Sequence, residues 1–471
     1  MLFNSFQFLV FFFVFFIVFF SVPQKIKPFF LLLASSYFYY CFIPVYILIL
    51  YGLILVDFFA GILIEKFSRH RLFLLVGSIV ANIGILSFFK YYNFFTDIVN
   101  NVTGSHFLLL NILLPVGLSF HTFQSLSYVI EVYKGNYKAE RNFFTYALYV
   151  MYFPQLVAGP IERPYHLIPQ LKQHFTFQPE NIMTGLRLIV WGFFKKIVVA
   201  DRLGMYVDMV YNNPGEFHWL NVLLAVFYFA IQLYCDFSGY SDIAIGLAKM
   251  MGIDLMINFN RPFFASTIRD LWNRWHISLT SWFRDYVYIP LGGNKKGLSR
   301  QLLYILIVFS ISGLWHGANF TFVLFGVSNG ILISMLLLMN STFKKWFATP
   351  AFINCLFTFF LFSLTCIFFR AETLEKSFSV FADVFSFQNP KGFTFNFGLT
   401  TADGSLTWGN TMQVIATAFL LLLFIIEYKY SPTLAELNKK PFMDTVLLCS
   451  LILIIVFFGI FQNKSFIYFQ F

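Results

Sequence analysis

The sequence predicts an all-α integral membrane protein that crosses the bilayer many times. Of its 471 residues, 59% are hydrophobic and only 11% are charged, and the mean hydropathy is +0.73. Apolar stretches without charge recur along almost the whole chain. A stretch of about 20 such residues can span a bilayer as a helix, because the backbone hydrogen bonds of a helix are satisfied internally. No soluble domain of ordinary size is expected.

The first apolar run is predicted to be a membrane span that is kept. Residues 1–24 carry no charge, and the first basic residues, Lys25 and Lys27, follow the run. A cleaved signal peptide would have its basic segment before the apolar core. The five cysteines lie in or beside apolar runs without CxxC spacing, so we interpret them as buried free thiols.

Basic residues predict the orientation of the N-terminal part, because loops rich in Lys and Arg stay on the cytoplasmic side. Lys25 and Lys27 therefore place the N-terminus outside. Inside and outside then alternate through the next segments: two short spans in 28–64 broken near Pro44, a span over about 72–92, an outer loop over 96–106, and a span over about 108–132.

The middle of the chain is expected to contain segments that do not cross the membrane. Gly159 and Pro160 break a helix, and 165–180 is too polar to span, which favours a cytoplasmic or interfacial position. Residues 183–212 mix apolar and charged residues, which suits a helix in the interface or packed inside the bundle. The segment 258–300 has seven basic and two acidic residues and is predicted to be cytoplasmic, as an interfacial helix that bears a pocket.

One histidine lies where the sequence predicts the membrane interior. An apolar segment leads up to His316, and a second leads from Asn319 to the basic pair Lys344 and Lys345. At about 1.5 Å per helical residue, His316 would lie roughly 24 Å from the cytoplasmic face of a core about 30 Å thick. A titratable ring at that depth is costly and indicates a functional site. His276 is expected at the inner surface, far from His316.

Six motifs follow one another along most of the chain. They are LPVGLSF (114–120), FPQLVAGPI (153–161), YCDFSGYSD (234–242), the tryptophan-rich block 272–294, SGLWHGA (312–318) and FIYFQF (466–471). At these motifs the sequence resembles the membrane-bound O-acyltransferase superfamily. Within that superfamily it is similar to the bacterial alginate O-acetyltransferase-like branch and to the teichoic-acid D-alanyl transfer proteins.

The resemblance implies a bundle of about eleven transmembrane helices, with re-entrant or horizontal helices, around a central pore. It implies a single membrane domain over 1–471, in which peripheral N-terminal helices (about 1–110) and C-terminal helices (about 346–471) flank a catalytic core (about 111–345). The location implied is the cytoplasmic (inner) membrane, with membrane lipid around the bundle. The net charge of +10 follows the membrane topology and does not indicate a nucleic-acid partner.

The activity implied is transfer of an acyl group, with acetyl favoured, from a cytoplasmic thioester to hydroxyls of an extracytoplasmic polysaccharide. The donor would be acetyl-CoA or an acyl-carrier thioester, and no bound cofactor or metal is expected. Transfer would be direct or through a periplasmic or cell-surface acyltransferase partner. D-alanyl transfer to teichoic acid is the alternative within the family. The polar stretch 371–410 is expected outside, where a partner could bind; a pull-down after deletion of 385–407 tests this.

The resemblance makes His316 the essential residue for acyl transfer and places His276 nearer the cytoplasm. A neutral imidazole can take the proton from a hydroxyl as it attacks a thioester carbonyl. A covalent acyl-histidine is equally compatible with the sequence. A structural histidine bonded to a backbone carbonyl is the other reading of His316. For His276, direct chemistry, a place in the donor channel and a purely architectural role all stay open.

Five further residues are candidates for binding the donor or the reacting group: Trp272, Arg274, Trp275, Trp315 and Asn319. The last two, or a backbone N–H near Gly317, could donate a hydrogen bond to the developing oxyanion. The basic residues of 258–300 could attract the phosphates of coenzyme A or an acidic carrier protein, or could simply follow the positive-inside rule.

The sequence also allows interpretations other than acyl transfer. Asp236 and Asp242 could bind substrate, but acids bonded to helix ends or to Arg are as compatible with the pattern, and we leave them out of catalysis. A transporter would usually show internal repeats, which the sequence lacks. A haem oxidoreductase would need histidines at matching depth on facing spans. The sequence has no P-loop or dinucleotide-binding fingerprint.

Overall fold

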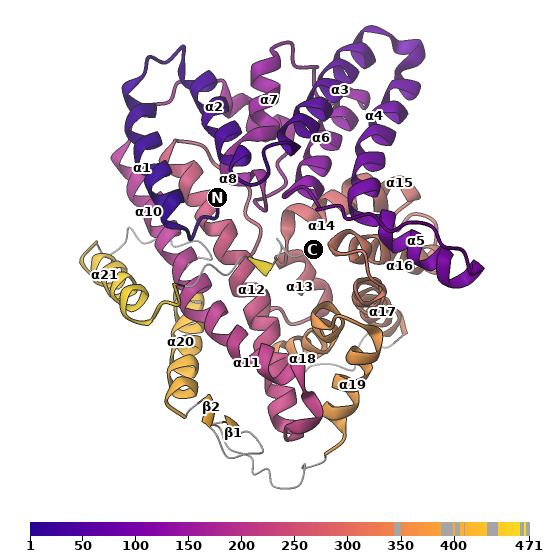
Figure 1. Cartoon of the computed structure of the whole chain (residues 1–471), viewed down its shortest axis with the longest axis vertical. Coiled ribbons are helices and arrows are strands. Elements are labelled where there is room, and N and C mark those ends of the chain that lie inside the picture. Colours follow the sequence, from indigo (N-terminus) through magenta and orange to yellow (C-terminus); the bar gives the residue numbers. More distant parts are fainter. Residues whose placement is uncertain are drawn as a thin grey trace. The chain divides into compact units, whose positions relative to one another are not determined.

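The computed structural model describes residues 1–342, 350–387, 399–400, 406–408, 410–430, 441–461 and 466–467 (Figure 1). This part of the chain is helical apart from one short antiparallel pair, β1 (Leu399–Thr400) and β2 (Leu406–Trp408). The prediction of an all-α fold is therefore confirmed, with that hairpin as the exception among the described residues.

The backbone packs into two compact units. Unit 1 comprises residues 1–189 and 240–257, and unit 2 comprises 190–239 and 258–467, within the described ranges. Two helices, α10 (Pro179–Phe193) and α12 (Trp219–Met250), have residues in both units. The division into peripheral helices, catalytic core and C-terminal helices stays a prediction.

Unit 1 is built from short and medium helices. They are α1 (Phe6–Ser21), α2 (Lys27–Tyr40), α3 (Tyr46–Lys66), α4 (Arg71–Leu86), α5 (Tyr92–Thr103), α6 (Leu118–Tyr133), α7 (Phe143–Met151), α8 (Phe153–Leu156) and α9 (Pro164–Leu171), with a 3₁₀ turn at Ser68–His70 and a π-helix at Ser87–Tyr91. The predicted break near Pro44 is confirmed between α2 and α3. In Figure 1, α3, α4 and α6 lie side by side, and they pack against one another.

Two predicted boundaries in unit 1 are wrong. The expected loop over 96–106 begins late, because α5 continues to Thr103 and ends at Gly104 in a left-handed conformation. The expected span over 108–132 starts only at Leu118. Pro115 lacks a backbone N–H, and Gly117 has φ of +77° with its Cα against the Leu156 carbonyl, where a Cβ would lie 2.8 Å away.

Unit 2 contains helices that range from 3 to 23 residues in length. They are α11 (Asp201–Asn212), α13 (Ile268–Arg274), α14 (Ile277–Phe283), α15 (Ile289–Leu291), α16 (Leu298–His316), α17 (Phe320–Thr342), α18 (Ala351–Arg370), α19 (Leu374–Phe385), α20 (Asn410–Lys429) and α21 (Pro441–Phe458). Short 3₁₀ turns lie at Pro214–Glu216 and Pro262–Phe264, and π-helices at Phe194–Ala200 and Arg284–Tyr288. The predicted helix leading up to His316 is thus confirmed.

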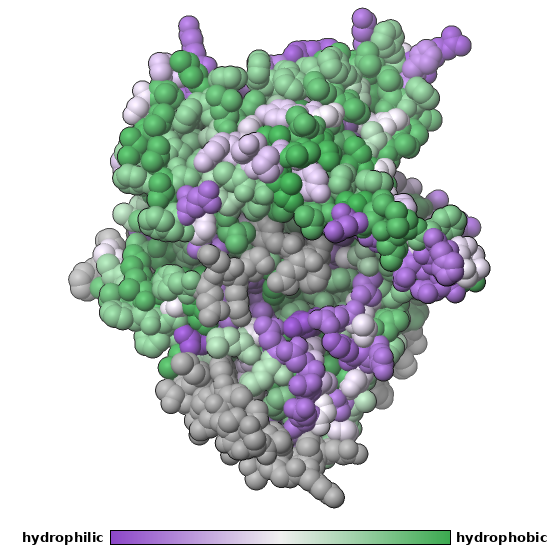
Figure 2. All heavy atoms as spheres, in the orientation of Figure 1, coloured by the Kyte–Doolittle hydropathy of each residue, from purple (hydrophilic) through white to green (hydrophobic). Residues whose placement is uncertain are grey.

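Six described helical segments are long and apolar enough to cross a membrane: Tyr46–Lys66, Ser68–Thr103, Trp219–Met250, Leu298–His316, Phe320–Met339 and Ala351–Arg370. Phe6–Ser21 and Asp444–Phe458 are shorter apolar helices. Large apolar side chains such as Phe13, Leu48 and Phe73 are exposed, and Figure 2 shows apolar surface over α1, α3 and α4. Such a surface suits lipid contact, and the chain is a multi-pass membrane protein.

The charged helical segment predicted over 183–212 is packed inside the protein. The Lys196 side chain is 1% exposed and pairs with Asp236 Oδ1 at 2.6 Å and Asp201 Oδ1 at 2.9 Å. All three residues belong to unit 2. Asp236 is therefore a buried ion-pair partner.

Candidate functional site

The end of α16 places His316 next to the start of α17. A Cβ on Gly313 would lie 2.2 Å from the Phe322 carbonyl oxygen, so the two helix backbones are in close contact at this glycine. Small residues allow such close helix packing in membranes. His316 is the last residue of α16, and the chain turns through Gly317 into α17. The hairpin therefore fixes the position of the imidazole.

His276 occupies the break between α13 and α14. Its φ and ψ are +45° and +52°, a left-handed conformation that costs about 1–3 kcal/mol for a non-glycine residue. The backbone on both sides is held by the segment 258–260: Asn260 N donates to Arg274 O at 2.9 Å, and Ile277 N donates to Asn258 O at 2.9 Å. The expected single interfacial helix is therefore wrong, because the chain turns at this histidine.

The two histidines meet at Trp315. The Trp315 ring centre lies 6.0 Å from the His276 ring and 5.0 Å from the His316 ring. His276 is 1% exposed and His316 is 5% exposed. Burial, and then the charge of the nearby His316, lower the pKa of His276 well below its usual value. His276 is therefore neutral at neutral pH.

The prediction that His276 lies at the inner surface, far from His316, is wrong. Its neighbour Trp315 lies about 25 Å along α16 from that helix's first residue. The charge pattern placed the whole segment 258–300 at the surface, whereas the turn at His276 enters the helical bundle. The distribution of Lys and Arg predicts on which side of the membrane the basic residues lie, but it does not predict how the backbone runs between them.

Aromatic rings enclose the cluster of His276, Trp315 and His316, which we call the histidine cluster. Phe237 of α12 lies 4.6 Å from the His276 ring, and Phe369 of α18 lies 5.3 Å from the His316 ring, measured between centres. The side chains come from four separate parts of unit 2. Such surroundings exclude water and strengthen electrostatic interactions inside.

Of the other predicted tryptophans, Trp272 lies in a pocket and Trp275 lies in a packed core. Trp272 Nε1 donates to Asn329 Oδ1 at 3.1 Å, and Asn329 Nδ2 donates to Thr365 Oγ1 at 3.1 Å. These two hydrogen bonds connect α13 to α17 and α18. Trp275 packs against Phe362, with ring centres 4.9 Å apart and the ring planes tilted by 58°, and does not line the pocket.

Arg274 and Asn319 have local partners. Arg274 Nε donates to Asp270 Oδ1 at 3.0 Å, one turn back on α13. Asn319 Nδ2 donates to Glu372 O at 2.8 Å, and its Oδ1 accepts from Thr321 N at 3.1 Å. Both ends of the Asn319 amide are therefore engaged in holding the start of α17, which disfavours the predicted role as oxyanion donor.

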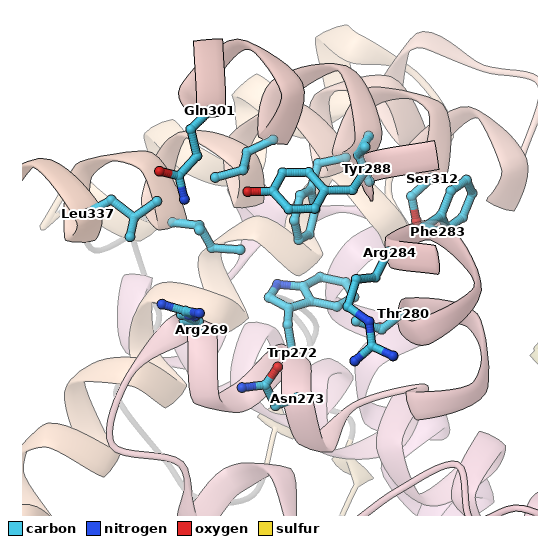
Figure 3. Close-up of a pocket in the computed structure, with 14 residues that line it drawn as sticks. Arg269, Trp272, Asn273, Thr280, Phe283, Arg284, Tyr288, Gln301, Ser312 and Leu337 are labelled. Atoms are coloured by element: carbon cyan, nitrogen blue, oxygen red, sulfur yellow. The ribbon is translucent and has the colours of Figure 1, made fainter. Parts of the chain in front are cut away.

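A pocket of about 200 Å³ opens beside the histidine cluster, lined by residues of α13, α14, α16 and α17 and of the π-helix Arg284–Tyr288. Figure 3 shows Trp272 between Arg269 and Arg284, with Tyr288 and Gln301 on the opposite wall. Both arginines are exposed. Ser312, also in the lining, is buried and lies one helical turn, about 6 Å, before His316 on α16.

The structure places Arg269, one of the basic residues of 258–300, in the pocket lining, and places Arg274 outside it. Arg269 and Trp272 are three residues apart on α13 and share a face, so the i, i+3 spacing was the available signal. Arg274 lies on the face of Asp270. Within the described ranges, no group of three or more His, Cys, Asp or Glu side chains forms a metal site.

Known proteins match the chain over this site and beyond it. A sequence profile of the membrane-bound O-acyltransferase family matches residues 138–371, which include both histidines. The peptidoglycan O-acetyltransferase of Helicobacter pylori is 32% identical over 94% of this chain and 91% of its own length. The chain belongs to the membrane-bound O-acyltransferase family. The resemblance stated from the six motifs is confirmed.

Two further relatives of this O-acyltransferase have other names. The probable alginate O-acetylase AlgI of Pseudomonas aeruginosa is 37% identical over 76% of this chain and 69% of its own. The teichoic acid D-alanyltransferase of Bacillus subtilis is 27% identical over 61% of this chain and 73% of its own. The O-acyltransferase is thus similar to both acetylating and D-alanylating proteins.

Proposed function

We propose that this O-acyltransferase carries an acetyl group from a cytoplasmic thioester to hydroxyls of an extracytoplasmic polysaccharide, in the cytoplasmic membrane. The observation that carries the proposal is the buried histidine cluster, one helical turn from a pocket with two exposed arginines. The relatives named for peptidoglycan and alginate acetylation support a polysaccharide acceptor. The D-alanyltransferase relative makes D-alanine the second candidate group.

His316 is the proposed base. Its neutral imidazole takes the proton of the acceptor hydroxyl while the hydroxyl oxygen attacks the thioester carbonyl. The new C–O bond forms, the C–S bond breaks, and the donor leaves as a thiol after it regains the proton. The Trp315 indole N–H and a backbone N–H near Gly317 are the proposed donors to the oxyanion. His276, on the other side of Trp315, is proposed to position that ring.

The pocket is the proposed donor site. Its volume of about 200 Å³ suits a thin acylated thioester arm and leaves the bulk of the donor outside. The exposed guanidinium groups of Arg269 and Arg284 would attract phosphates of coenzyme A or acidic residues of a carrier protein. The arm would pass Trp272 and reach Ser312, one turn from His316.

The proposal is tested by measuring alkali-labile acetate on isolated extracellular and envelope polysaccharide from cells with and without the protein. Loss of the ester in cells without the protein is the expected result. If those cells keep the wild-type level of acetate but lose D-alanine ester, the transferred group is D-alanyl and not acetyl. Unchanged levels of both esters would refute transfer to polysaccharide.

Arg269→Gln is expected to raise the KM for the donor several-fold and to leave kcat nearly unchanged. The exposed guanidinium contributes attraction that is equal in the ground state and the transition state. Steady-state kinetics in membranes at low and high salt measure the effect, which should shrink as salt screens it. Arg274→Gln is the matched control, because Arg274 lies on the same helix but outside the pocket. Equal effects of both changes would count against a donor site here.

The finer architecture is part of the same proposal. A bundle of about eleven spans around a pore would let the donor enter on one side and the acceptor on the other. A periplasmic or cell-surface partner would receive the acyl group near the polar stretch 371–410. Much of that stretch, including most of 385–407, lies outside the described residues.

A further inference from the structure

A carboxyl group lies buried at the middle of a membrane-spanning helix, away from the residues used so far. Asp57 is residue 12 of the 21 in α3, one of the segments long and apolar enough to span the bilayer. Its side chain is 0% exposed. An ionisable residue inside a membrane segment is expensive, and it usually marks an ion or substrate site.

Two side chains of α4 bind this carboxyl group. Ser78 Oγ donates to Asp57 Oδ1 at 2.6 Å, and Asn82 Nδ2 donates to Oδ1 and Oδ2 at 2.9 and 3.0 Å. The two partners are one helical turn apart, and Asn82 Nδ2 also donates to Ser78 O at 3.0 Å. Both are buried. The carboxyl group on α3 is thus held by two buried side chains of α4.

Three more oxygen atoms are buried around the carboxyl group. The Ser125 hydroxyl of α6 is a hydrogen-bonding neighbour of Asp57 and of the Tyr146 hydroxyl of α7, and Tyr146 also interacts electrostatically with Asp57. Asn82 Oδ1 is also buried and has no hydrogen-bond partner in the structure. Each of these atoms is buried, and an unsatisfied buried oxygen costs about 1–3 kcal/mol. Oxygen atoms on three helices, α4, α6 and α7, thus surround the carboxyl group of α3.

No positive side chain balances the charge of Asp57. Its interactions involve Ser78, Asn82, Ser125 and Tyr146, and among the residues that the structure describes no Lys, Arg or His forms an ion pair with it. Beyond Tyr146, the titratable groups on or packed against α3 include Tyr128 of α6, whose ring centre lies 4.4 Å from that of Tyr146, the buried His121 of α6, one helical turn before Ser125, and Glu65 of α3, which pairs with Arg141. A buried carboxylate without a counter-charge is destabilised by several kcal/mol.

The oxygen donors determine which ligand fits. Hard cations prefer carboxylate, hydroxyl and amide oxygens, and a divalent ion would need more than the single negative charge available here. The amide of Asn82 can turn its oxygen toward the carboxyl group, since the two ends of an amide are nearly isosteric. We propose that Asp57, with Ser78, Asn82, Ser125 and Tyr146, binds one small monovalent cation, either a proton or a sodium ion, within unit 1. This proposal does not depend on the proposed acyl transfer.

The test measures the thermal stability of the purified full chain in detergent. Tm is recorded at constant ionic strength in sodium and in choline chloride, and from pH 5 to pH 9, for the wild type, Asp57→Asn and Asp254→Asn. A ligand that binds only the folded state raises Tm with its concentration. We expect sodium or acid to raise the wild-type Tm by about 2 °C or more relative to Asp57→Asn. Asp254→Asn removes an exposed carboxylate and should follow the wild type.

A second measurement works on the wild type alone and separates the two cations. Dicyclohexylcarbodiimide adds to protonated carboxyl groups in apolar surroundings, and peptide mass spectrometry locates the adduct. Labelling of Asp57 that increases at low pH and is blocked by sodium identifies a sodium site in competition with protons. Labelling that increases at low pH and ignores sodium identifies a proton site. The proposal would be overturned if Asp57 is not labelled and the wild-type Tm responds to sodium and to pH no more than the Tm of Asp57→Asn does.

Discussion

His316→Ala is expected to reduce acyl transfer by about 10²- to 10⁴-fold while the protein still inserts at its wild-type level. The imidazole is at the end of α16, enclosed by Trp315, Phe325 and Phe369, where it can hold a proton from the attacking hydroxyl. Water that fills the vacated space is a weaker and less well placed base. The readout is ester on polysaccharide, with membrane levels matched by blot.

The control for this variant is His70→Ala, which removes an exposed histidine of unit 1. It should leave the ester level unchanged. Ester that requires the protein but survives in His316→Ala would contradict the catalytic assignment. A labelled acetyl group that stays on the protein in the absence of acceptor would indicate the covalent route through histidine in place of general-base catalysis.

Lys196→Met is expected to lower the free energy of unfolding by about 3–5 kcal/mol, the largest stability effect that we predict. The ammonium group lies between the carboxylates of Asp201 and Asp236, and all three side chains are at most 5% exposed. Removing it leaves two buried negative charges without their partner. Chemical or thermal unfolding of the purified protein in detergent measures the loss.

Two further variants decide whether burial is the cause. Lys196→Met/Asp236→Asn should be more stable than Lys196→Met, because it removes one of the orphaned charges. Lys249→Met breaks an ion pair with Asp254 that is partly open to solvent, and we expect it to cost no more than about 1 kcal/mol. Similar losses in Lys196→Met and Lys249→Met would show that the buried position adds nothing.

The fold class and His316 could be predicted because each depends on local sequence. Apolar length identifies spans, Pro44 marks a break, and His316 stands out against apolar neighbours. The position of His276 could not be predicted, because it depends on a left-handed turn held by the segment 258–260. Side-chain charge does not report such backbone contacts.

The remaining errors have physical causes of the same kind. Arg269 lines the pocket and Arg274 does not, because they lie on different faces of α13, and the sequence does not state which face meets the pocket. Asp57 is a single acid within an apolar run, and only the packing of α3 against α4, α6 and α7 brings its oxygen partners together. Which face of a helix meets a pocket, and which helices pack against each other, depend on the tertiary structure.

The left-handed backbone at position 276 restricts which amino acids can replace the histidine at all. Asparagine and aspartate accept this conformation several-fold more readily than other side chains, and glycine accepts it freely, whereas β-branched residues are outliers there. If the gene accumulated mutations under selection for folding alone, only a few amino acids would therefore be found at position 276. Two independent requirements, the left-handed backbone conformation and the imidazole side chain, therefore restrict the residue at position 276.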